Sequence, residues 1–159
     1  MTDPSVPFAS MTASMNRDEM LRREQDGWTA LMATVERVPS NRRSELGVVP
    51  GWSVKDLVWH CGRWADWVRE PLGRIVTGTY DRDREYPWEQ MNDDWAEESK
   101  GLSWDEVTSG AAAMRRDALA ALVTLEVVGD DVVREFNSET FEHYAEHAAE
   151  IERFAEVSG

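Results

Sequence analysis

Apolar residues recur at three- and four-residue steps along most of the chain, the spacing that places them on one face of an α-helix. Four such stripes are present, over residues 16–39, from Ser53, from Ser103 and over residues 138–157. No segment alternates apolar and polar residues for long enough to form a strand. The pattern therefore predicts an all-α protein whose four helices bury their stripes against one another as an antiparallel bundle.

Helix-start signals support this division of the chain. Ser53 with Asp56, and Ser103 with Glu106, have the spacing of a capping box, in which the two residues satisfy amides of the first helical turn. Residues 1–15 contain proline, serine and threonine but no helical period. We therefore predict a flexible tail over 1–15 and a single domain over 16–159.

Between the stripes the sequence is less regular. The polar segment 77–101 carries scattered aromatic residues, and a short helix is expected at about Glu89–Ser99. Residues 127–136 are expected to connect two helices. In the last stripe Glu139, Glu142 and Glu146 fall on the side opposite the apolar residues and are expected to face solvent.

Composition narrows the range of functions. The 159 residues include 17 Lys and Arg against 31 Asp and Glu, which gives a net charge of −14. This acidity argues against nucleic acid and anionic membranes as partners. A single cysteine allows no internal disulfide, and no apolar run approaches the length of a membrane span. We therefore expect a cytoplasmic protein that acts on a small molecule.

The whole histidine content of the chain falls where a bundle could gather it. His60 projects from the apolar stripe of the second helix, while His143 and His147 lie one turn apart at the edge of the last stripe. Each has a plain structural alternative: a lone histidine on an apolar face is more often a core residue, and an i, i+4 pair can form a solvated rim. Burying three imidazoles without partners is costly. The joint placement therefore favours a three-histidine metal site with an open coordination position.

Two other features favour ordinary packing over chemistry. Cys61 lies on a core stripe with no basic neighbour fixed by spacing, so we expect a buried and unreactive thiol. Tryptophans at helical spacing, such as Trp28 and Trp52, are usually core residues, although they could line a pocket.

Two segments carry a family resemblance. The run Gly51–His60, with sequence GWSVKDLVWH, resembles the start of the second helix in DinB-like (YfiT-like) four-helix bundle proteins. The run His143–His147 is similar to the HxxxH on the last helix of that family. More loosely, the region Trp88–Trp95, which includes Asn92, resembles the family's insertion before the third helix.

The resemblance implies an up-down-down-up bundle with one divalent metal, zinc or nickel, held by His60, His143 and His147. The relatives include mycothiol- and bacillithiol-dependent S-transferases and the mycothiol-dependent maleylpyruvate isomerase. That isomerase has a glutamate at the second ligand position, where this chain has His143. Members often form homodimers. A related branch, the ClbS-like proteins, protects its host as a hydrolase that needs no metal.

The sequence and the resemblance together predict a metal-dependent enzyme that uses a low-molecular-weight thiol such as mycothiol in detoxification or stress response. Tyr144 is a candidate to support the histidines through hydrogen bonding. Trp64, Trp88, Asn92 and Trp95 are the residues expected to contact substrate. The alternative is a non-catalytic binding or self-protection protein on the same bundle, whose metal is absent or only structural.

Overall fold

The computed structural model describes residues 15–157 and contains helices but no strand within that range. Its elements, in chain order, are α1 (Arg17–Glu36), the 3-10 turn η2 (Ser40–Arg42), α2 (Val54–Trp67), α3 (Arg69–Thr77), α4 (Trp88–Lys100), α5 (Trp104–Thr124), α6 (Asp130–Glu139) and α7 (Phe141–Glu156).

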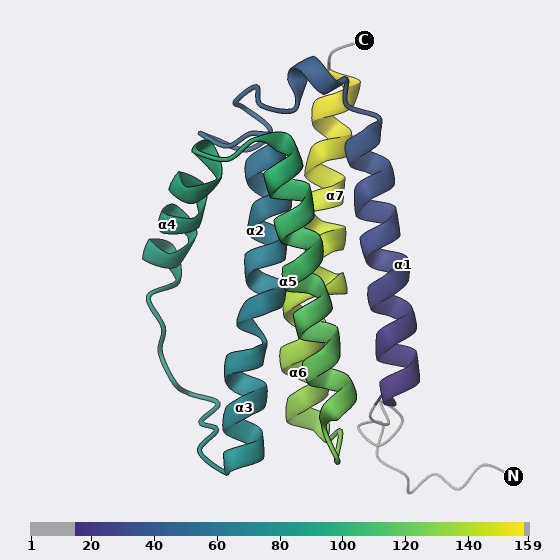
Figure 1. Ribbon diagram of the computed structural model, residues 1–159, viewed down its shortest axis with the longest axis vertical. Helices are drawn as coiled ribbons and strands as arrows, with labels where there is room; N and C mark the ends of the chain where they lie inside the picture. The colour runs from purple at the N-terminus through teal and green to yellow at the C-terminus, as the bar shows by residue number, and fades with distance from the viewer. Residues whose placement is uncertain (1–14, 158–159) are drawn as a thin grey trace, which may run out of the picture.

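The long helices run up, down, down and up, as the resemblance implies (Figure 1). The chain rises through α1, descends through α2 and α3, and crosses back along the outside through α4. It then descends again through α5 and rises through α6 and α7. The crossover makes α2 and α5 parallel neighbours, and it leaves α4 as a flanking helix beside α2.

Close packing joins the helices in two pairs, α2 with α5 and α1 with α7. The first pair approaches most closely at Gly62, where an added Cβ would lie 2.8 Å from the Cα of Ala111. Only glycine fits at that spacing. The buried stripe of α2 thereby lies between α5 on one side and α7 on the other.

The predicted helix starts are confirmed by their hydrogen bonds. Ser53 and Asp56 form a complete capping box at α2, as do Ser103 and Glu106 at α5. The Asp56 carboxylate also accepts a hydrogen bond from the Ser99 hydroxyl at the end of α4. A helix-start signal in the sequence therefore also anchors the flanking helix to the bundle.

Two of the long helices are interrupted. Pro71, expected to end or kink the second helix, lies in the first turn of α3, where its missing amide is not needed. The prediction of a connection over 127–136 is wrong, because α6 occupies most of it. Two aspartates in the first turn of α6 and buried Val132 and Phe136 stabilise this helix.

Only the last residue of the predicted tail falls within the described residues. The predicted tail over 1–15 lies outside the described residues apart from Met15, which packs against the apolar cluster at the α3–α6 end of the bundle. Within residues 15–157, no helix is both long enough and apolar enough to cross a membrane.

Candidate metal centre

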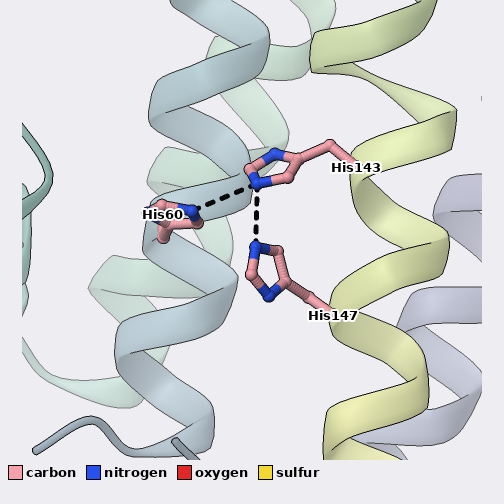
Figure 2. Close-up of side chains that lie close together, drawn as sticks. All are labelled: His60, His143 and His147. Atoms are coloured by element: carbon pink, nitrogen blue, oxygen red, sulfur yellow. Dashed lines mark hydrogen bonds between the residues drawn. The ribbon is translucent and has the colours of Figure 1, made fainter. Parts of the chain in front are cut away.

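The three histidines meet inside the bundle, with His60 coming from α2 and the other two from α7 (Figure 2). The Nε2 atoms of His60 and His143 are 3.2 Å apart, and those of His143 and His147 are 2.8 Å apart. His60 and His147 are only 6% and 9% exposed. The predicted juxtaposition of the three rings is therefore present in the structure.

Hydrogen bonding among the rings does not satisfy them. The Nδ1–H of His147 donates to Glu150 Oε2 over 2.6 Å, which leaves a lone pair on its Nε2. His143 Nε2 can carry only one proton, yet it faces nitrogens of both other rings. The Nδ1 atoms of His60 and His143 are buried and have no hydrogen-bond partner among the described residues. Nitrogen lone pairs of the three rings therefore face one another, and there are too few N–H protons between them for hydrogen bonds to satisfy all three.

The surroundings keep two of these rings neutral. Burial, followed by charge repulsion from the neighbouring His143 and His147, lowers the pKa of His60 to about 2. Burial, followed by repulsion from His147, lowers the pKa of His143 to about 3. Neutral imidazole is the form that binds metal ions.

The donor set fits a divalent ion. Zinc–nitrogen bonds of about 2.0–2.1 Å in a tetrahedral site place two ligand nitrogens about 3.3 Å apart. The observed spacings of 3.2 and 2.8 Å are close to this value, and one donor atom from each of the three residues lies within 4.8 Å of the others. Glu150 supplies the carboxylate partner that commonly orients a ligating histidine.

A cavity of about 280 Å³ opens beside the histidines. Its walls include His60 and His143, together with Trp64, Trp88 and Asn92. Trp64 is fixed by its indole N–H, which donates to Asn92 Oδ1 over 2.9 Å. Three of the four residues expected to contact substrate therefore lie on one wall, and α4 brings two of them there.

The fourth, Trp95, lies behind this wall. Its ring packs edge-on against Trp64 with centroids 5.1 Å apart, and the Arg63 guanidinium lies over it. Trp95 is not among the residues that line the cavity, so the structure gives it contact with Trp64 and not with the cavity itself.

The hydroxyl of Tyr144 does not reach the histidines. It is fully buried and donates to Glu24 Oε1 on α1 over 3.2 Å. Cys61 is also fully buried, and burial raises the pKa of its thiol. Both residues therefore contribute to the packing of the bundle, and the carboxylate that orients His147 is Glu150.

The sequence pattern missed Glu139, which lines the cavity with His60 and His143. We expected it to face solvent because the last helix was predicted to begin near Ser138, which would place Glu139 on the same continuous helix as His143. The break at Thr140, with φ −114° and ψ −106°, changes the direction that Glu139 faces. Burial raises the pKa of Glu139 to about 7, with a smaller contribution from neighbouring Glu135. No signal for this break was recognised in the sequence.

Solved structures with the same fold support the architecture. An uncharacterised protein from Escherichia coli UTI89 is similar over 94% of this chain and 98% of its own, with a TM-score of 0.72 and 17% identity. The colibactin self-resistance protein ClbS, crystallised in complex with double-stranded DNA, is similar over 88% of this chain and 95% of its own. Its TM-score is 0.71 and its identity 12%.

The ClbS complex corrects one prediction. Nucleic acid was excluded as a partner on net charge, and that exclusion is wrong because a protein with this fold has been crystallised with double-stranded DNA. Net charge is a sum over the whole surface, whereas phosphates contact local groups of donors. An acidic total therefore does not decide the matter.

Comparison by sequence gives a match over most of the chain. The family model described as the mycothiol maleylpyruvate isomerase N-terminal domain matches residues 21–136. The matched region includes His60 and ends before His143. No protein with a curated description matches the chain.

Proposed function

The chain belongs to the family of the mycothiol maleylpyruvate isomerase N-terminal domain, and on this premise we propose that it is a metal-dependent enzyme of detoxification or stress response. Its substrates are a low-molecular-weight thiol of the mycothiol or bacillithiol type and an electrophile. The observation that carries this proposal is that three imidazoles meet beside a cavity lined in part by tryptophan. Burial keeps two of these rings neutral, and Glu150 orients the third.

His60, His143 and His147 hold one divalent ion, zinc or nickel, through their Nε2 atoms. When bound, such an ion supplies a Lewis acid that lowers the pKa of a thiol or of water. His60 and His143 stay neutral because they are buried, and His147 is oriented by Glu150. The chain thereby holds His60 and His143 in the neutral form that metal binding requires.

The cavity wall orients the substrate. The Trp64 indole, fixed by Asn92, offers an apolar surface next to His60 and His143. Trp88, which is 39% exposed at the start of α4, lines the same cavity and is partly open to solvent. These aromatic faces exclude water from the reacting atoms and favour a substrate with an apolar portion.

Metal content tests the first half of the proposal. We expect protein purified without a histidine tag to contain close to one zinc or nickel ion per chain, measured by inductively coupled plasma mass spectrometry. Supplying zinc or nickel to metal-free protein should restore full occupancy. A chain that takes up neither metal is the non-catalytic binding or self-protection protein instead.

Turnover tests the second half. The metal-loaded protein is mixed with a bimane electrophile and with mycothiol, bacillithiol, glutathione or cysteine in turn. We expect one of the first two thiols to be conjugated faster than the other thiols and faster than without protein. Conjugation no faster than the protein-free rate for every thiol would refute the transferase proposal while leaving the metal site intact.

The ClbS complex provides a second candidate ligand, double-stranded DNA. Because the chain is strongly acidic, such binding would be weak and would fall steeply with salt. Fluorescence anisotropy with a labelled duplex at low and physiological salt tests it.

Size-exclusion chromatography with light scattering on the protein alone tests the expectation of a homodimer.

A further inference from the structure

Glu139 stands at the junction of two cavities. It lines the cavity beside His60 and His143, and it also lines a second cavity of about 100 Å³. Trp88 is the other residue common to both. The carboxylate therefore borders the space next to the histidines without being one of the three donors that converge there.

This carboxylate has no counter-charge. Within the part of the chain that the structure describes, no cation pairs with Glu139, and its hydrogen bond is a 3.5 Å contact from the Ser138 hydroxyl of the preceding residue. The two buried carboxylates among the described residues are better satisfied, because Glu24 is bonded to Arg115 and Asp56 accepts hydrogen bonds from Ser53 and Ser99. A half-buried acid without a counter-charge is unfavourable for folding, which points to a role in chemistry.

The charges around Glu139 are mixed. Acidic neighbours on its own helix and on α7 raise the pKa of Glu139, because they disfavour another negative charge nearby. The segment before α4 brings both signs and a hydroxyl into the second cavity. The charged and titratable groups concerned are Glu135, Glu142, Glu146, Asp81, Arg82, Arg84 and Tyr80, together with His60 and His143 in the first cavity.

We propose that Glu139 is the catalytic acid and base of this cavity, which accepts the proton of the bound thiol and returns it to the product. The inference rests on the proposed function, because it needs a thiol bound beside His60 and His143. A carboxyl group whose pKa is about 7 is present in both protonation states at neutral pH, as such a role requires.

The proton balance can be followed through addition to an α,β-unsaturated ketone. The S–H bond breaks and its proton passes to the Glu139 carboxylate. The sulfur electron pair forms a bond to the β-carbon while the carbon–carbon π pair moves to the α-carbon. The α-carbon then takes the proton from Glu139, so the thiol has added across the double bond and the carboxylate is restored.

Calorimetry tests the first transfer without any turnover. Mycothiol is titrated into metal-loaded protein at pH 7.5 in buffers of different ionisation enthalpy, which reports the protons released to solvent. We expect little release from the wild type, because Glu139 keeps the proton. Glu139→Gln should release about one proton per bound thiol.

Kinetics test the return of the proton. With mycothiol and methyl vinyl ketone we expect Glu139→Gln to lower kcat/KM by about 10²–10³-fold and to flatten the pH profile near pH 7. With bromobimane the loss should be smaller, because departing bromide needs no proton. Metal content should stay unchanged, since Glu139 is not a ligand.

Glu156→Gln is the matched control, because Glu156 is an exposed carboxylate on α7 that lines neither cavity and is not among the acids that raise the pKa of Glu139. It should behave as the wild type in both experiments. Thiol binding with equal proton release by wild type and Glu139→Gln would overturn the role of Glu139 alone. Absence of any binding heat with mycothiol would overturn this inference, and the thiol panel then decides separately whether the proposed function survives.

Discussion

The bundle buries two polar clusters that differ in one respect. In the first, Arg115 donates two hydrogen bonds to the Glu24 carboxylate, at 2.5 and 2.7 Å, and Tyr144 donates a third. In the second, three imidazoles face one another, and two of their Nδ1 atoms have no partner among the described residues. The first cluster pairs opposite charges within the chain, whereas the second gathers three nitrogen donors of the same kind.

The difference separates structural from functional polar groups in the same core. The Glu24–Arg115 pair joins α1 to α5 with opposite charges, and α7 joins it through Tyr144. Its removal should therefore affect stability. The histidine cluster brings like groups together at a cost that the bound cation of the proposed function would offset. Its removal should therefore affect ligand binding.

The largest expected effect is on the stability contributed by the Glu24–Arg115 cluster. Arg115→Met leaves the fully buried Glu24 without a counter-charge and should lower the free energy of unfolding by about 3–5 kcal/mol, measured by urea denaturation. The double variant Glu24→Leu, Arg115→Met should lose less, because no lone charge remains. If the double variant lost as much as the single one, packing and not charge would explain the loss.

The next largest effect is on metal binding by the histidine cluster. His147→Ala should weaken zinc binding by more than about 100-fold, measured by competition with a chromogenic chelator. The metal-free variant should lose far less stability than Arg115→Met does. Unchanged zinc affinity in this variant would show that the three histidines are only a core contact.

A smaller effect is expected from the group that orients the site. Glu150→Gln weakens the hydrogen bond to His147 Nδ1 and should reduce zinc affinity by about 10–100-fold. Glu146→Gln is the control, since Glu146 is an exposed carboxylate on the same helix. Equal losses in both variants would indicate a general effect of negative charge.

The smallest effect is a slope with pH in the metal-free protein. The pKa values of His60 and His143 in the folded state lie below the usual 6.5, so the unfolded state binds more protons as pH falls below that value. The free energy of unfolding should therefore fall as the pH is lowered, by about 1.4 kcal/mol in total between pH 7 and pH 6, because each histidine contributes about 0.7 kcal/mol over that interval. The double variant His60→Gln, His143→Gln should show a shallower slope in urea denaturation, and a slope equal to that of the wild type would contradict the assignment.

The meeting of the three histidines could be predicted because it follows from periodicity. His143 and His147 lie one turn apart on any helix that contains both, and His60 shares a stripe with Leu57 and Cys61, which must face the core. In a small bundle, residues that face the core from different helices lie close to one another. The contribution of α4 to the cavity wall came from resemblance, because residues 77–101 have no apolar period that fixes their place.

The role of Glu139 could not be obtained in the same way. Helical periodicity holds only while the helix continues, and the break at Thr140 interrupts it between Glu139 and His143. The Glu24–Arg115 pair escaped prediction for a different reason, since its partners are 91 residues apart and nothing local joins them. Long-range pairing of charges leaves no trace in a single sequence.

The topology gives the histidine cluster a further consequence for the chain as a polymer. His60 and His143 are 83 residues apart in sequence, and α7 packs against the first helix of the chain. An ion that joined α2 to α7 would bind the folded chain and not the unfolded one, so it would stabilise the fold by RT ln(1 + [metal]/Kd). In a protein with one cysteine, the histidine cluster would then act as a reversible cross-link between the last helix and the bundle, with a strength set by the concentration of free metal.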